Sequence, residues 1–157
     1  MTSIFEKMRL RPSQLRTVAE RRFDDAQALR KTRQNARANG AMYLGGFVIE
    51  CLLKASLLER FPSLQGNHPK GSLSRKEERL WSLCHRSHEL TEILTHLPHV
   101  MRKMERAEPR ERFRLTASLQ WICSHWTIHA RYSTQTATIT DADDFLQMVQ
   151  ELKQWLR

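Results

Sequence analysis

The sequence predicts an all-α protein, a single domain over residues 1–157 built as a bundle of about five main helices. Apolar residues recur at steps of three and four in several segments, the spacing that places them on one face of a helix. Segment 40–58 is the longest apolar run, and capping motifs or prolines stand where several other helices should begin. The chain is 40% hydrophobic and 27% charged, which is the composition of a globular domain.

The first predicted helix begins at Pro12, which suits a first helical turn, and is expected to run to about Asn35. Residues 1–11 before it form a short helix or a mobile arm and lack the apolar core of a signal peptide. Asn39-Gly40 marks the expected break before the next helix. A basic run follows the apolar face of the first helix, and it is either a solvated face or a surface that tracks phosphate groups. Its members are Arg16, Arg21, Arg22, Arg30, Lys31, Arg33 and Arg37.

The long apolar run predicts the central helix of the bundle, with residues 41–58 the most buried part of the chain. Gly45 and Gly46 each lower helix propensity by about 1 kcal/mol, for which the close approach of a neighbouring helix backbone would compensate. Glu50 and Lys54 are the only charges in the run and stand four residues apart in the favourable order. They form either an ion pair at the solvent edge or part of a polar pocket beside the core.

Shorter helices are predicted after a loop at 61–71, which is rich in proline and glycine. Ser74 and Glu77 have the spacing of a capping box and open a helix that is expected to end at Leu83. Ser87 can cap the following helix, whose apolar positions continue up to the next proline.

The late part of the chain predicts two longer helices. Pro109 opens the first of them, which we expect to reach Arg131. Its apolar stripe consists of Leu115, Leu119, Ile122, Trp126 and His129. Residues 132–138 are polar and predict a loop, and Thr140 with Asp143 has the spacing of a second capping box that starts the last helix.

The formal net charge of +9 is the strongest compositional observation. Such a surplus creates a positive field that attracts polyanions, and the planar guanidinium of arginine suits bidentate contacts with phosphate. Nucleic acid is therefore the first candidate partner, and a membrane surface or an acidic protein comes next. No uncharged apolar run approaches the length of a membrane-spanning helix, so no membrane association through such a helix is expected.

The cysteines predict reduced thiols in the core of a cytoplasmic protein, because their number is odd and their spacing is wide. They are Cys51, Cys84 and Cys123. His125 and His129 would share a helical face, a spacing compatible with a metal site, but no third ligand is evident. We therefore expect no metal and no cofactor.

A resemblance to one family rests on three stretches. Segment 41–55, Ala-Met-Tyr-Leu-Gly-Gly-Phe-Val-Ile-Glu-Cys-Leu-Leu-Lys-Ala, resembles the second helix of HEPN domains. Segment 87–94, Ser-His-Glu-Leu-Thr-Glu-Ile-Leu, and Arg131-Tyr132-Ser133 before a last amphipathic helix agree in order and spacing. The resemblance implies an up-and-down helical bundle, a homodimer, and a role with RNA or nucleotides in a toxin–antitoxin or anti-phage defence system. A cognate antitoxin or a nucleotidyltransferase is the partner that it implies.

The resemblance also bears on catalysis, because nucleases of this family carry an Arg-x4-6-His motif. Arg131 stands where that arginine is expected, but positions 136–138 are Thr-Ala-Thr and contain no histidine. A literal match at Arg79–His85 lies on the wrong segment and is of a kind that arises by chance. The missing histidine favours an RNA-binding protein without nuclease activity.

Two other functions remain open. A metal-independent endoribonuclease toxin would combine Arg131 with a histidine from elsewhere, His88 or His129, as general acid or base. A basic helical adaptor would instead bind an acidic protein partner without nucleic acid.

The expected binding site is centred on Arg131, which can hold a phosphate, and Tyr132, which can stack on a base. Glu50 and Lys54 of the central helix, with His88 on its neighbour, are expected nearby. Arg131 has a structural alternative, which is to cap helix carbonyls or to pair with Asp141, Asp143 or Asp144.

Overall fold

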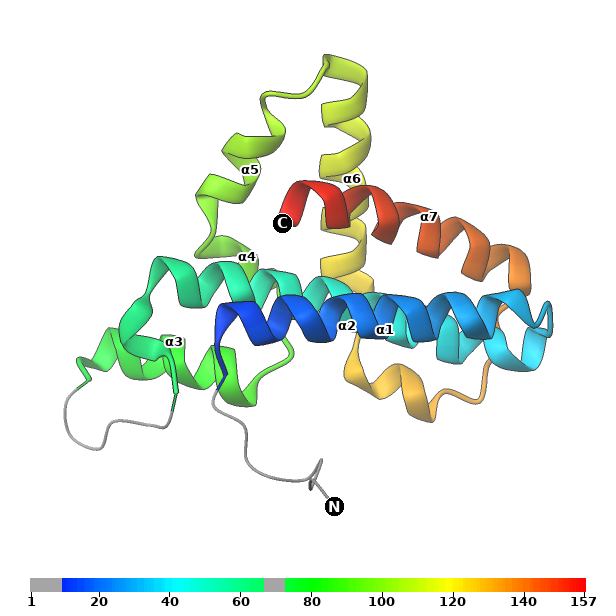
Figure 1. Cartoon of the computed structure of the whole chain (residues 1–157), viewed down its shortest axis with the longest axis horizontal. Helices are drawn as coiled ribbons and strands as arrows, with labels where there is room; N and C mark the ends of the chain where they lie inside the picture. Colours follow the sequence, from blue (N-terminus) through cyan, green and yellow to red (C-terminus); the bar gives the residue numbers. More distant parts are fainter. Residues whose placement is uncertain (1–9, 67–72) are drawn as a thin grey trace.

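The computed structural model describes residues 10–66 and 73–157, and within these ranges it is all α (Figure 1). The all-α prediction is confirmed, with seven α-helices among the described residues where about five main helices were expected. The α-helices are α1 (Pro12–Lys31), α2 (Asn35–Arg60), α3 (Arg75–Arg86), α4 (Leu90–Thr95), α5 (Pro98–Met104), α6 (Pro109–His125) and α7 (Ile139–Leu156). Two 3-10 helices, η1 (Pro62–Leu64) and η2 (Ile128–Tyr132), complete the described elements.

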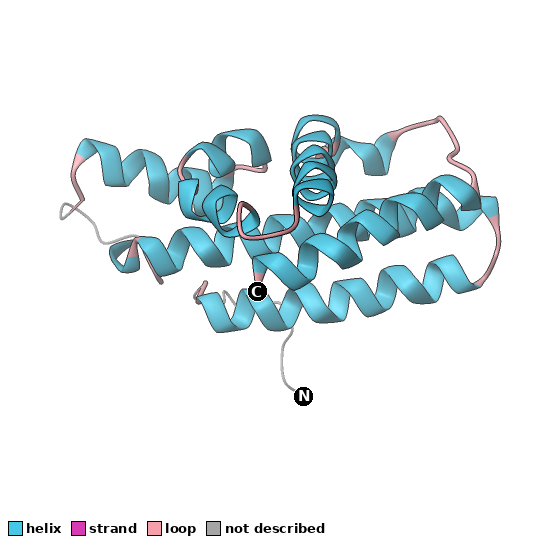
Figure 2. Cartoon of the chain, turned by 90° about the horizontal axis from the view of Figure 1, so that it is seen from above, coloured by secondary structure: helices cyan, strands magenta, loops and turns pink. Residues whose placement is uncertain are grey.

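Helix α2 is the centre of the fold, as predicted. Every residue from 48 to 58 is buried, and α2 packs most extensively against α1, which runs antiparallel to it, and against α7 (Figure 1). Helix α6 runs steeply across this layer, so that it is seen nearly end-on in Figure 2. The described fold is therefore a helical layer with a crossing helix, and it departs in this respect from a regular up-and-down bundle.

Two of the three glycines of α2, Gly45 and Gly46, make room for side chains. A Cβ on Gly46 would lie 2.0 Å from Cδ1 of Trp126, and a Cβ on Gly45 would lie 2.7 Å from Cδ2 of Leu146. Neighbouring atoms do approach the two glycines closely, as predicted. These atoms belong to side chains, so the expectation that a helix backbone approaches them was wrong. Trp126 uses the space to bury its ring and to donate from Nε1 to the carbonyl oxygen of Tyr43 at 3.1 Å.

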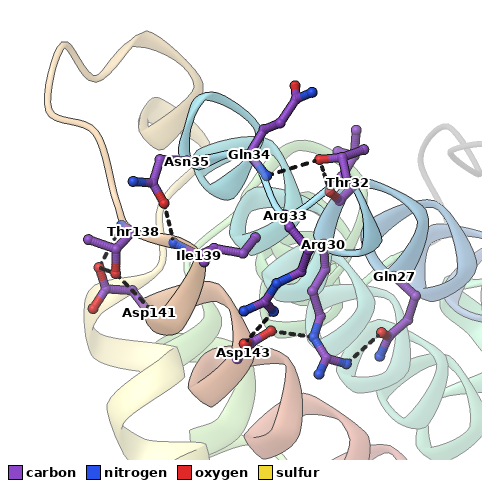
Figure 3. Close-up of polar contacts among 11 residues, drawn as sticks. Gln27, Arg30, Thr32, Arg33, Gln34, Asn35, Thr138, Ile139, Asp141 and Asp143 are labelled. Atoms are coloured by element: carbon purple, nitrogen blue, oxygen red, sulfur yellow. Dashed lines mark hydrogen bonds and ion pairs between the residues drawn. The ribbon is translucent and has the colours of Figure 1, made fainter.

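The break between α1 and α2 lies at residues 32–34, so the prediction at Asn39-Gly40 was wrong. Arg33 turns the chain with a φ of 57°, a left-handed conformation that few non-glycine residues adopt. Asp143 of α7 stabilises this turn, because its carboxylate pairs with Arg30 at 2.5 Å and with Arg33 at 2.7 Å (Figure 3). A long-range ion pair, rather than a local glycine, thus accompanies the turn.

Helix α7 begins two residues earlier than predicted. The sequence contains two overlapping Thr-x-x-Asp matches, and the capping box uses Thr138 with Asp141 instead of Thr140 with Asp143. Asp141 accepts from the Thr138 backbone at 2.7 Å, and Asp143 is left for the arginines of the α1–α2 turn (Figure 3).

The other predicted boundaries are mixed. The capping box of Ser74 and Glu77 at the start of α3 is confirmed, but α3 continues to Arg86, beyond the expected end at Leu83. Helix α6 ends at His125 instead of Arg131. Its apolar stripe stays buried as far as Trp126, where the chain becomes extended.

Helix α2 is long and apolar enough to span a membrane by length and composition, which the search for uncharged runs had not indicated. In the structure 78% of its most apolar window is buried within the fold, and the core helix of a soluble protein passes the same test. The predicted N-terminal arm lies mainly in residues 1–9, outside the described residues, as does segment 67–72 of the predicted loop.

Candidate functional site

Glu50 and Lys54 form a buried ion pair, with Nζ of Lys54 2.7 Å from Oε1 of Glu50. Their side chains are 3% and 8% exposed, so the interpretation as a solvent-edge pair was wrong. The pair is buried beside the groove described below and does not itself line it, so the expected polar pocket is present only in part. His88 completes the cluster, because its Nδ1 lies 2.9 Å and 3.1 Å from the two carboxylate oxygens of Glu50. The sequence thus predicted the members of this cluster from two separate helical segments.

The cluster also fixes the link between α3 and α4. Lys54 donates from Nζ to the carbonyl oxygen of Ser87 at 2.7 Å, and the hydroxyl of Ser87 accepts from the backbone N–H of Glu89 at 3.1 Å. Burying two ions costs several kcal/mol per ion before their attraction and hydrogen bonds offset it, and apolar residues of similar volume often serve stability as well. A buried ion pair whose carboxylate also contacts a partly exposed histidine is therefore a candidate for function.

His88 is held in a defined orientation. A carboxylate only accepts hydrogen bonds, so Nδ1 of His88 carries the proton in the neutral ring and Nε2 is the acceptor. The side chain is 36% exposed, and within the described residues no hydrogen bond occupies Nε2. A carboxylate-oriented imidazole with one unoccupied nitrogen can accept a hydrogen bond from a hydroxyl or, when protonated, contact a phosphate.

His88 lines a polar groove of about 570 Å³. One wall is the α3–α4 link, residues 86–91, and the other is the corner at which α6 passes into η2, residues 123–129. Thr91 ties the walls together by donating to the carbonyl oxygen of Cys123 at 2.9 Å. The groove is lined by one cationic side chain, Arg86, and by three histidines that donate to an anion when protonated, namely His88, His125 and His129. Hydroxyl side chains and the carboxylate of Glu89 also line it.

Arg131 and Tyr132 lie on η2 with His129, but they do not line the groove. Both are exposed, and the Arg131 guanidinium lies 4.8 Å from the centre of the Tyr132 ring. No ion pair within the described part of the chain involves Arg131. The structure therefore gathers Glu50, Lys54 and His88 as expected, and places Arg131 and Tyr132 beside that cluster's groove rather than in it.

The remaining histidine predictions change because of where the helices end. His129 is exposed on η2, so its assignment to the core stripe of α6 was wrong. His125 and His129 consequently do not share a helical face, and no group of metal-binding side chains occurs among the described residues. Arg79 pairs with Glu92 and His85 stacks on Trp81, so both ends of the literal Arg-x5-His match have structural contacts.

The basic run of α1 is partly neutralised. Arg16 pairs with Glu59 at 2.7 Å and donates to the carbonyl oxygen of Leu156, while the two arginines of the α1–α2 turn pair with Asp143. Arg16, Arg30 and Arg33 thus form contacts between helices, which neither the interpretation as a solvated face nor that as a phosphate-tracking surface had included.

The three cysteines are buried and free, which confirms the prediction of core thiols. Burial raises the pKa of Cys51 to about 12, of Cys84 to about 11 and of Cys123 to about 12. The reactive thiolate form is therefore suppressed, and a nucleophilic role is not supported.

Several residues of the groove were not found from the sequence. Arg86 was placed in a break between helices, and His125 was considered only as a metal ligand. Arg86 and His125 reach the groove because α3 ends at Arg86 and α6 ends at His125. In the sequence, the apolar Trp126 between the polar residues His125 and Thr127 was a local sign that the chain changes direction there.

Comparison with known proteins adds no assignment. No family model matches the sequence, no curated protein matches it, and no solved structure matches it. Membership of the HEPN family, the homodimer, the cytoplasmic location and the partner protein thus stay predictions from sequence.

Proposed function

We propose that this chain is an RNA-binding protein that binds single-stranded RNA in the groove above His88 and does not cleave it. The observation that carries the proposal is the buried Glu50–Lys54 pair, which fixes His88 at the edge of a groove that Arg86 and two further histidines also line. The net charge of +9 adds the long-range attraction that a polyanion requires. The role in a toxin–antitoxin or defence system, with a homodimer and a cognate antitoxin or nucleotidyltransferase, is part of the same proposal and rests on the resemblance alone.

Single strands suit the groove better than a duplex. Its volume of about 570 Å³ is that of a cleft for one or a few nucleotides, with Arg86 and His88 on one wall and His125 and His129 on the other. RNA offers the 2′-hydroxyl as an additional partner, which the acceptor Nε2 of His88 can bind. The proposal therefore includes a preference for RNA over DNA of the same sequence.

A second candidate function is cleavage by a metal-independent endoribonuclease. The Glu50–His88 pair supports it, because a carboxylate that orients an imidazole is an arrangement suited to general base catalysis. His129 on the other wall of the groove would serve as the acid, and Arg86 would hold the phosphate. The absence of a histidine at 136–138 and the position of Arg131 outside the groove favour binding without cleavage.

The test is anisotropy of a short labelled single-stranded RNA, titrated with the protein at several salt concentrations. Arg86→Ala should weaken binding and reduce the slope of log affinity against log salt by about 0.7, the contribution of one phosphate contact to a single strand. Arg75→Ala is the matched control, since Arg75 is an exposed arginine at the opposite end of the same helix.

The outcomes separate the candidates. Binding of intact RNA supports the proposal, whereas RNA shortened by the wild-type protein but not by His88→Ala or His129→Ala supports the nuclease. Absence of RNA binding at low salt, with capture of an acidic protein, would support the adaptor. The effect of Arg131→Ala on binding tests whether η2 contributes beside the groove, and light scattering tests the homodimer.

A further inference from the structure

A second cavity shares a wall with the groove. It has a volume of about 280 Å³ and is lined from α2, the end of α6, the segment after η2 and α7. His125 and Trp126 line both cavities, so the corner between α6 and η2 separates them. This cavity is called the aromatic pocket, and its ring-bearing residues are Tyr43, Trp121, His125, Trp126 and Phe145.

The rings of the aromatic pocket are already arranged for stacking. Trp121 and His125 stack with centroids 4.7 Å apart and planes 14° apart, and Trp121 meets Phe145 edge-on at 6.1 Å. Trp121 is 43% exposed, so part of the residue remains accessible in spite of these contacts. Exposed tryptophan at the edge of an apolar cavity is typical of a site that takes a flat, largely apolar ligand.

The outer wall of the pocket is held in place from α2. Asn39 donates from Nδ2 to the carbonyl oxygen of Gln135 at 2.6 Å and accepts at Oδ1 from the backbone N–H of Ala137 at 2.7 Å. Asn35, one turn earlier, accepts from the backbone N–H of Ile139 at 2.8 Å (Figure 3). The two asparagines thus attach the segment before α7 to α2, and this wall is formed without a ligand.

A few polar groups remain for a ligand. Gln135 and Thr136 line the pocket, and no hydrogen bond of their side chains occurs within the described residues. The ring of His125 uses Nδ1 to contact the carbonyl oxygen of Trp121 at 2.8 Å, which leaves Nε2. Stacking faces with a small number of donors and acceptors at the rim are the features that recognise a nucleobase.

We propose that the aromatic pocket takes one base of the RNA strand whose backbone lies in the groove. The inference rests on the proposed function, and it adds the site that reads or holds a base. The shared wall makes it geometrically simple, because a strand that crosses the α6–η2 corner has its phosphates on the donor side and a base on the aromatic side. Exposed Arg131 lies on η2 next to Ala130, which lines the pocket, and provides positive charge beside it.

The test compares two labelled oligonucleotides, a single-stranded RNA and an abasic strand of the same length and charge. Trp121→Ala should lower affinity for the RNA by about tenfold or more, the effect of losing the stacking of one base, and leave affinity for the abasic strand unchanged. Trp121→Phe, which keeps a stacking ring, should retain most of the affinity. Phe113→Ala is the control, since Phe113 is an aromatic residue of the same helix, 79% exposed and outside the aromatic pocket.

The results separate this inference from the function on which it rests. If the wild-type protein binds both oligonucleotides and Trp121→Ala has no selective effect on the RNA, the aromatic pocket is not a base site although RNA binding stands. If the wild-type protein binds neither oligonucleotide, RNA binding itself fails and the inference fails with it. Circular dichroism of each variant identifies loss of fold, and in that case Trp121→Phe decides, because the inference requires that it bind the RNA more tightly than the abasic strand.

Discussion

Gly46→Ala is expected to destabilise the protein, although alanine is the better helix former. The added Cβ would lie 2.0 Å from Cδ1 and 2.1 Å from Nε1 of Trp126, far inside the separation of about 3.5–4.0 Å at which carbon atoms pack. The indole must therefore shift from its buried position. It is 9% exposed and bonded to the carbonyl oxygen of Tyr43, so movement breaks that hydrogen bond and opens the wall shared by the two cavities.

The magnitude follows from two opposing effects. Removing a large aromatic side chain from a core costs about 3–5 kcal/mol, and displacing Trp126 loses a comparable set of contacts. Alanine in place of glycine within a helix returns about 1 kcal/mol. The free energy of unfolding should thus fall by about 2–4 kcal/mol, which lowers the Tm by roughly 4–16 °C for a domain of this size.

The assay is urea unfolding followed by circular dichroism, with Gly40→Ala as the matched control in the same helix. A Cβ on Gly40 would meet only Cδ1 of Leu29, at 3.1 Å, and the end of that side chain can yield. Gly40→Ala should therefore be neutral or stabilising by up to about 1 kcal/mol. Equal stability of the Gly46→Ala variant and the wild type would refute the packing of Trp126 against α2.

Three further predictions concern charge and burial. Glu50→Gln should lower the free energy of unfolding by about 3–5 kcal/mol, because it leaves the buried Lys54 without its counter-charge, and a double variant with Lys54→Met should recover much of the loss in urea unfolding. Hydrogen bonds from Arg30 and Arg33 lower the pKa of Asp143 below 3.8, so its carboxylate stabilises the fold above that value and loses the effect as the pH falls through the lowered pKa. Asp143→Asn should consequently reduce the Tm at pH 7, with a difference from wild type that vanishes in acid; a difference that persists unchanged at low pH would exclude the ion pair as its cause. Burial raises the pKa of the three thiols to about 11 or 12, so Ellman's reagent should react with them in urea and only slowly in the native protein, whereas rapid native labelling would show that the core is open.

The sequence was sufficient for the elements whose causes are local. Segment 41–58 is apolar around most of a helix and is continuously buried from 48 to 58, and the capping box of Ser74 with Glu77 starts α3. The sequence predicted that His88 lies near Glu50, but it did not predict the contact between their side chains. The burial of the Glu50–Lys54 pair could not be predicted, because it depends on how α3 and α4 cover the pair. Periodicity places a residue on a face and does not say what covers that face.

The errors arise where a distant residue decides the local structure. The α1–α2 turn contains no glycine or proline that would mark it in the sequence. Arg33 adopts the left-handed conformation there and is paired with Asp143 of α7, a residue far away in the sequence. The apolar spacing of α6 continues past its end, because Trp126 is buried against Gly46 by a turn of the chain and not by another turn of helix. The position of His129 and the second wall of the groove depend on that turn, so the site was only half predictable.

The central claim, that RNA binds in the groove above His88, is tested most directly by NMR of the histidine side chains during titration with a short single-stranded RNA. The chain has seven histidines, which single substitutions can assign. Signals of His88, His125 and His129 should shift with RNA, while those of His85, which stacks on Trp81, and of His99 should stay in place. RNA binding that leaves the His88 signals unchanged would contradict the claim.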